Sequence, residues 1–172
     1  MPSPLGHALG GIAAGWIVAP PRDRSVAGTL RSAALFAAFA LVPDVDLLLN
    51  QHQGPTHSLG AALIAGLAVG AFTRQGRLGA AAACAYASHV FLDWLGADTA
   101  PPFGVMALWP VSDEYYLSRV DLFLGVLRHY RPGFWAFNLK SIAREVLILA
   151  PVAWIVFRLR VKPAHRNSQS RV

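Results

Sequence analysis

Charged residues and cysteine are both scarce in this sequence, and each shortage excludes a class of protein. Charged residues make up 14% of the 172 residues, whereas soluble globular domains contain about 25%. The chain therefore has too little polar surface to cover an ordinary water-soluble globule, and part of its surface is expected to face lipid. Its single cysteine, Cys84, excludes an intrachain disulfide and a four-cysteine zinc site. Because Cys84 lies in an apolar run, we expect a buried, inert thiol.

The sequence also lacks the marks of a signal peptide and of a nucleic-acid-binding surface. No Lys or Arg precedes Leu5, so we expect the first apolar segment to be retained. The net charge is +6, but five of the fifteen Lys and Arg residues lie in the C-terminal tail, directly after an apolar run and without interleaved aromatics. That distribution is typical of the cytoplasmic flank of a membrane helix, and we expect no nucleic-acid partner.

Apolar runs dominate what remains, with hydrophobic residues at 55% of the chain. Five runs lack the period-2 alternation of strands and are long enough for helices. They are Leu5–Ala19, Leu30–Val42, Leu59–Phe72, Leu78–Leu95 and Ile142–Phe157. The connection from Gly96 to Lys140 is expected to contain one more helix, around Tyr115–Leu127.

These runs predict an all-α fold, a polytopic membrane helical bundle with a long outer connection. We expect one membrane-embedded domain over residues 1–160 and a basic, disordered tail over 161–172. The runs Leu5–Ala19 and Leu59–Phe72 are shorter than the about 20 residues that cross a bilayer, so they could instead be buried core helices.

The positions of Lys and Arg predict an orientation. If every run crosses the membrane, ten of the fifteen, with Arg31 included, fall on the side that holds Pro20–Thr29, Thr73–Arg77 and the tail. The cytoplasmic side of a membrane protein is enriched in Lys and Arg. We therefore expect a multi-pass protein of the inner (plasma) membrane, with the N-terminus outside and the C-terminus in the cytoplasm.

Eight possible metal ligands fall on the outer side in this topology. They are His7, Asp44, Asp46, His52, His57, His89, Asp93 and Glu145. His89 and Asp93 are four residues apart on an apolar helix, so their side chains share one face. Asp44 and Asp46 follow a helix end, and both reach one site only if that end is irregular. A carboxylate near the membrane is costly unless it is paired or bound, which favours a metal site.

Each of these residues also has a purely structural alternative. The histidines and acids could cap helices, shape a loop or join two helices by a hydrogen bond, and Glu145 could form an interfacial ion pair with Arg144. The metal hypothesis depends on their convergence and not on any single position.

Several motifs are similar to those of a known family. They are the opening Met1–His7, the element Pro43–Asp46, the loop His52–Ser58, the pair His89 and Asp93, and the turn Leu108–Pro110. Farther along the chain, only the pair Arg144 and Glu145, which opens the last apolar run, is suggestive of the same family. In these motifs the chain resembles the YdjM-like family of inner-membrane proteins described as metal-dependent hydrolases, over about its first 110 residues. The family loop usually has an arginine where this chain has Gln53, so a cation that could contact an anionic substrate is missing.

A fainter similarity is to the zinc-dependent phospholipase C and P1 nuclease group, which implies cleavage of a phosphodiester or phosphomonoester. The resemblances and the residues together predict a membrane-bound metal-dependent hydrolase. It would act on a phosphoester or lipid-linked substrate through a metal-activated water.

One or two divalent ions are expected, with zinc first and manganese or iron as alternatives. The expected metal ligands are His7, Asp44, Asp46, His57, His89 and Asp93, and the expected catalytic carboxylates are Asp46 and Glu145. The expected partners are membrane lipid and a lipid or phosphoester substrate. The alternatives are a non-catalytic metal-binding membrane protein, a structural integral membrane protein, and a soluble helical protein with an unusually apolar core.

Overall fold

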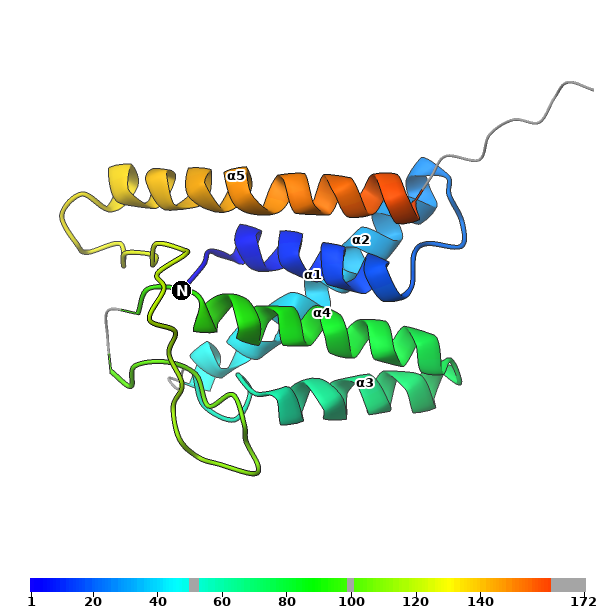
Figure 1. The fold of residues 1–172 in the computed structure, drawn as a ribbon, viewed down its shortest axis with the longest axis horizontal. Coiled ribbons are helices and arrows are strands. Elements are labelled where there is room, and N and C mark those ends of the chain that lie inside the picture. The colour runs from blue at the N-terminus through cyan, green and yellow to red at the C-terminus, as the bar shows by residue number, and fades with distance from the viewer. Residues whose placement is uncertain (50–52, 99–100, 162–172) are drawn as a thin grey trace, which may run out of the picture.

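Helices form the framework in a computed structural model that describes residues 1–49, 53–98 and 101–161 (Figure 1). The elements are α1 Pro4–Val18, α2 Val26–Leu41, the 3-10 helix η1 Val42–Leu49, α3 Leu59–Thr73, α4 Gly76–Trp94 and α5 Phe134–Arg160. Within those ranges no strand forms, although two isolated β-bridges are present. The predicted all-helical class is confirmed, and each predicted run overlaps one α-helix.

Serine side chains fix where three of the helices begin. Ser3, Ser25 and Ser58 precede α1, α2 and α3, and each hydroxyl accepts a hydrogen bond from a backbone N–H in the first helical turn. Such caps satisfy donors that have no partner inside the helix. The caps on α1 and α3 lie close to His7 and His57, so they also set where those two side chains emerge.

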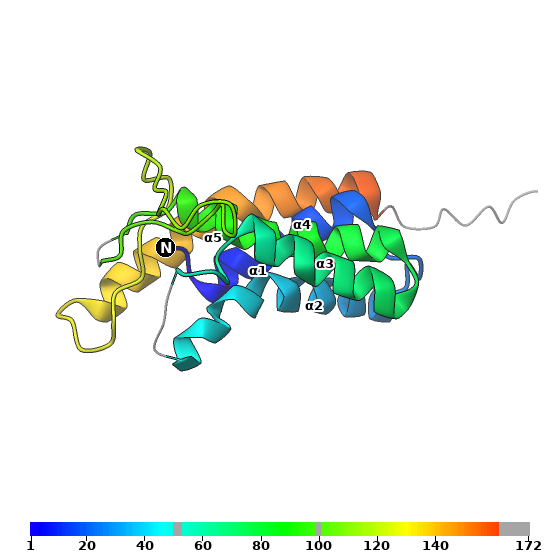
Figure 2. The same cartoon turned by 90° about the horizontal axis from the view of Figure 1, so that it is seen from below.

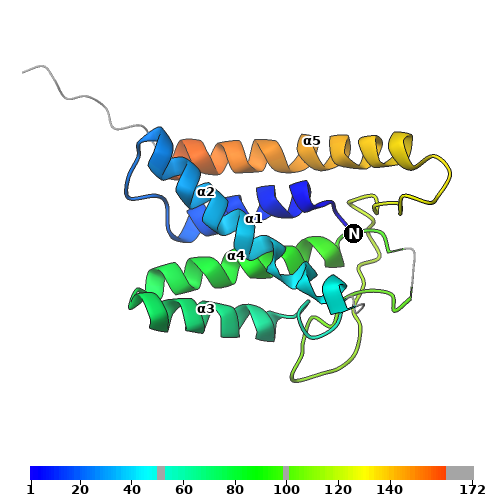
Figure 3. The same ribbon diagram turned by 180° about the vertical axis from the view of Figure 1, so that it is seen from behind.

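Four of the α-helices lie side by side, and α2 crosses them. In Figure 1, α5, α1, α4 and α3 follow one another across a single layer. Figure 2, which looks along the layer, shows α2 on one face of it, and Figure 3 shows α2 running obliquely across that face. α1 contacts α2, α4 and α5, so the first helix is the centre of the bundle.

Glycines allow the helices to approach closely at two crossings. A side chain at Gly15 of α1 would come within 2.2 Å of the Phe36 ring on α2, and one at Gly79 of α4 would come within 2.5 Å of the Gly66 carbonyl on α3. Small residues permit this backbone approach. α2 also contacts α4, where Ala40 lies next to His89.

The predicted polytopic membrane bundle is wrong. Among the described residues, one helical segment, Val26–Leu47, is long and apolar enough to cross a membrane. α1 and α3 have 15 residues each, and at about 1.5 Å per residue they fall short of the about 30 Å hydrocarbon core. The two remaining helices carry charges within their length, including Asp93 in α4 and Arg144 in α5. They pack with the shorter helices in a compact bundle.

The predicted helix around Tyr115–Leu127 is also wrong, because most of the backbone hydrogen bonds there are made to other segments. Val105 and Tyr116 exchange two N–H to carbonyl hydrogen bonds of 3.0 and 2.9 Å, and the Ala97 N–H donates to Phe123 at 2.9 Å. The segment is an irregular strap across one end of the bundle. The predicted tail from residue 162 onward and His52 lie outside the described residues. Cys84 is exposed, contrary to the prediction of a buried thiol.

Candidate metal centre

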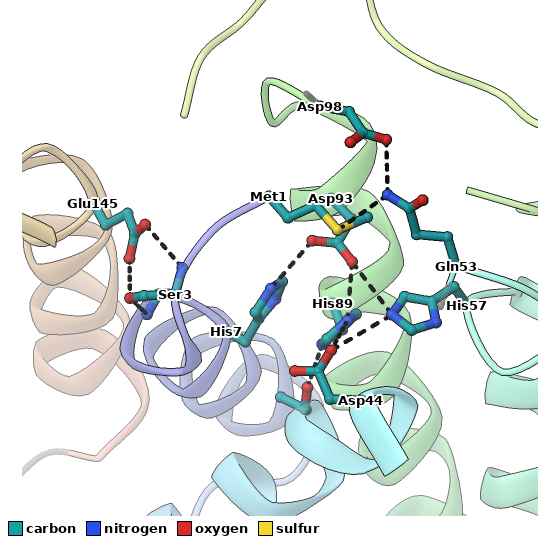
Figure 4. A network of polar contacts seen from close by, with 12 residues as sticks. Met1, Ser3, His7, Asp44, Gln53, His57, His89, Asp93, Asp98 and Glu145 are labelled. Atoms are coloured by element: carbon teal, nitrogen blue, oxygen red, sulfur yellow. Dashed lines mark hydrogen bonds and ion pairs between the residues drawn. The ribbon is translucent and has the colours of Figure 1, made fainter. Parts of the chain in front are cut away.

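Five histidine and aspartate side chains from four separate segments meet at one end of the bundle (Figure 4). They are His7 in α1, Asp44 in η1, His57 in the loop before α3, and His89 and Asp93 in α4. The sequence suggested these five, and the fold brings them together. We call this set the His/Asp cluster.

Asp93 lies at the middle of the cluster. Its Oδ1 atom is 3.2 Å from His7 Nε2, and its Oδ2 atom is 3.0 Å from His89 Nε2 and 3.6 Å from His57 Nε2. His89 and Asp93 occupy one face of α4, one turn apart. α4 is therefore the helix on which the three histidines converge.

Asp44 completes a second group of ligand atoms. Its Oδ1 atom lies 3.6 Å from His57 Nε2 and 3.7 Å from His89 Nε2. Two sets of three, His7 with His89 and Asp93, and Asp44 with His57 and His89, each have all their ligand atoms within 4.8 Å of one another. Because His89 belongs to both sets, the geometry suits either one shared ion or two adjacent ions.

The outer nitrogens of two histidines are held by other groups. His89 Nδ1 lies 2.7 Å from the Ala40 carbonyl, which can only accept, so this nitrogen carries a proton and Nε2 faces the cluster. His57 Nδ1 lies 3.1 Å from Asp46 Oδ2, which also accepts from the Thr56 hydroxyl at 2.8 Å. Partners of this kind orient metal-binding histidines. Asp46 therefore lies behind His57 and outside both sets of ligand atoms.

Burial makes the cluster costly unless a cation is present. The side chains of His7, His57, His89 and Asp93 are at most 2% exposed, while that of Asp44 is 26% exposed. Across residues 1–49, 53–98 and 101–161, His7 Nδ1 finds no hydrogen-bond partner, and His89 Nε2 and both Asp93 oxygens find none beyond the short contacts among the cluster residues themselves. A buried polar group without a hydrogen bond costs about 1–3 kcal/mol, and more when it is charged. A divalent cation would satisfy several of these atoms at once, so the donor set fits such an ion.

The protonation of these groups follows from their burial and their mutual charges. Burial lowers the pKa of His57, but contacts with Asp44, Asp46 and Asp93 outweigh it and raise that pKa to about 9. Burial lowers the pKa of His7. Burial favours the neutral form of Asp93, yet the charges of His7 and His89 keep its pKa well below the usual range. The cluster thus holds an ionised carboxylate and a proton on His57 that a metal ion would displace.

The structure does not bring Glu145 into the His/Asp cluster. Its buried carboxylate accepts a 2.9 Å hydrogen bond from the Ser3 N–H and a short one from the Ser3 hydroxyl, and the Ser141 hydroxyl lies 3.4 Å away. Glu145 thus links α5 to Ser3 at the start of α1, and Ser3 lies four residues before His7. Sequence reasoning missed Ser3 as this partner, although a serine directly before a helix is a recognisable cap.

A cavity of about 830 Å³ opens from the cluster. His7, Asp44 and Asp93 line part of it, and the partly exposed Asp44 connects the buried cluster to the cavity. Gln53 lines it too, and its side-chain amide donates to Asp98 at 2.8 Å. The cavity leaves room for a water molecule and a substrate beside any ion the cluster holds.

Comparison with known proteins identifies a family. The family described as YdjM inner membrane protein matches residues 1–164, which is most of the chain. No curated protein and no solved structure matches. The match covers all five residues of the cluster.

Proposed function

Because the chain belongs to the YdjM inner membrane protein family, we propose that it is a membrane-bound metal-dependent hydrolase. One observation carries the proposal. Buried His and Asp atoms without hydrogen-bond partners among the described residues adjoin a cavity large enough for a substrate. One or two divalent ions, with zinc first and manganese or iron as alternatives, would bind His7, Asp44, His57, His89 and Asp93.

A bound divalent ion would lower the pKa of a coordinated water and polarise the bond to be cleaved. The chain's residues supply the rest. Asp44 lies on the cavity wall and is partly exposed, so it is the carboxylate best able to take the proton from the attacking water. Asp46 orients His57, and Glu145 orients α1, so both act through the residues they hold. The substrate would be a phosphoester or a lipid-linked molecule.

A non-catalytic metal-binding protein is the second candidate, and the cavity argues against it. Structural metal sites are closed by protein ligands, whereas catalytic sites keep a position open for water or substrate. Here three cluster residues border a cavity. That access favours a catalyst.

Metal content and hydrolysis test the proposal together. The full chain, purified in detergent without a metal-binding tag, is expected to hold about one to two equivalents of zinc, manganese or iron. It should cleave p-nitrophenyl phosphate, bis(p-nitrophenyl) phosphate or phosphatidic acid, lose that activity to a chelator, and regain it on addition of one of these metals. A chain that binds none of them after supplementation would contradict the proposal.

The cluster is further proposed to lie on the outer side of the membrane. Arg22 and Arg24 precede the candidate span Val26–Leu47, and Asp44 lies near its other end. Lys and Arg are enriched on the cytoplasmic side. The end of α5 lies at the same end of the bundle as the start of α2 (Figure 3). Alkaline phosphatase fused to the C-terminus is therefore expected to be inactive in cells, because it needs the periplasm; activity comparable to a periplasmic control would overturn this orientation.

A further inference from the structure

A turn with two arginines forms part of the wall of the cavity that opens from the His/Asp cluster. Arg128 and Arg131 both line the cavity and both are exposed. The Arg131 N–H donates to the Arg128 carbonyl at 3.0 Å, which closes a tight turn. The turn lies between the strap and α5, at the end of the bundle where the N-terminus lies (Figure 1).

This part of the wall is fixed by α5. The side-chain amide of Asn138 bonds Leu127 in both directions, accepting from its N–H at 2.8 Å and donating to its carbonyl at 3.0 Å. One turn further along α5, the Ser141 hydroxyl donates to the Leu124 carbonyl at 2.8 Å. Both α5 side chains are buried. A binding surface whose backbone is already ordered loses less entropy when it binds a ligand.

The charge of the two arginines is available to a ligand. In the described part of the chain, neither guanidinium forms a salt bridge, and Arg128 donates a long hydrogen bond of 3.4 Å to the Tyr130 hydroxyl. The acids that share the cavity wall are committed elsewhere: Asp44 and Asp93 belong to the cluster, and Asp98 accepts hydrogen bonds from Gln53 and from the Gly104 N–H. The wall thus has a cationic part and, at a distance along it, an anionic metal-binding part.

We propose that Arg128 and Arg131 bind a phosphate group of the substrate while the His/Asp cluster faces the bond to be cleaved. The proposal rests on the proposed hydrolase function and adds which residues would bind the substrate's phosphate. Guanidinium groups bind phosphate oxygens through paired, charge-assisted hydrogen bonds. Leu47, Val126 and Leu127 line the same cavity, so a phosphate attached to an apolar chain fits it best.

Phosphate binding to matched variants tests the proposal. Affinity for inorganic phosphate and for dioctanoyl phosphatidic acid would be measured by calorimetry on the metal-loaded full chain in phosphatidylcholine nanodiscs. Arg128→Gln/Arg131→Gln is expected to weaken phosphatidic acid binding by about tenfold or more, since a hydrogen bond to a charged group is worth about tenfold in affinity. Arg119→Gln, an exposed arginine of the strap that does not line the cavity, should change binding less than twofold.

The two probes separate the sources of the phosphate. Much tighter binding of phosphatidic acid than of inorganic phosphate identifies a lipid, and similar binding identifies a soluble phosphate; the arginine effect is expected in either case. An unchanged affinity in the double variant, or no binding of either probe by the parent, overturns the proposal. Metal content is measured in parallel and should be equal in parent and double variant. If the chain binds no metal but still binds phosphate through these arginines, the hydrolase function alone is rejected. If it binds metal and hydrolyses its substrate equally well without these arginines, this inference alone is rejected.

Discussion

Replacing His89 and Asp93 together with alanine is expected to remove the bound metal and the hydrolytic activity while α4 remains helical. His89 belongs to both sets of ligand atoms, and Asp93 contacts three histidines. Loss of a residue that only orients a ligand already costs about 10–100-fold in metal affinity, so loss of two ligands should leave less than about a tenth of the parent's metal. Alanine has the highest helix propensity, so the helix itself is not weakened. Elemental analysis and circular dichroism of the same samples measure both results.

Two single variants test whether this result is specific to the metal ligands. Ser88→Ala changes the neighbouring residue on α4, whose hydroxyl bonds its own helix at Ala85, and should keep the parent's metal and activity. Asp46→Asn leaves all five cluster residues in place and should weaken metal affinity by about 10–100-fold, because Asp46 orients His57. Full metal content in the double alanine variant would show that these side chains only join helices, which is the structural alternative.

Local spacing predicts part of this site well. The interval of four residues between His89 and Asp93 puts both on one face of any α-helix, and the structure has them 3.0 Å apart. The sequence does not predict that Asp44 faces the cluster while Asp46 orients His57 from behind. This difference depends on the 3-10 geometry of η1, which turns Asp44 toward His89 and Asp46 toward Thr56. A sequence indicates that a helix ends at Pro43 but does not give the directions of the two side chains that follow.

Two errors in the predicted fold have identifiable physical causes. Apolar composition suits a membrane span, yet a run such as Leu59–Phe72 is also what a short helix needs to pack against a neighbour through glycines. The strap was predicted to be helical around Tyr115–Leu127, but its backbone bonds are made to Leu95, Ala97 and Val105. Such distant pairings leave no periodic signal in the sequence.

Glu145→Ala is expected to destabilise the protein strongly, because the change removes the acceptor for two donors at the start of α1. Both Ser3 and Glu145 are buried, and the Ser3 N–H and hydroxyl would lose their carboxylate partner. Each buried donor left unsatisfied costs about 1–3 kcal/mol, so the free energy of unfolding should fall by roughly 2–6 kcal/mol. For a chain of this size that corresponds to a drop in Tm of about 4–24 °C. Thermal unfolding of the metal-depleted chain measures it without interference from metal binding.

Glu145→Gln distinguishes this positioning role from the catalytic role that the sequence suggested. Glutamine keeps an oxygen that can accept from the Ser3 N–H, so most of the stability should return, and metal content and activity should return with it. A catalytic carboxylate or metal ligand would behave in the opposite way, since glutamine preserves shape but removes the charge. Glu114→Ala, an exposed acid on the strap, is the matched control and should leave Tm unchanged within about 1–2 °C. A stable Glu145→Gln variant without activity would therefore return Glu145 to the catalytic site, whereas a stable and active one identifies it as the anchor that holds α1, and with it His7, in place.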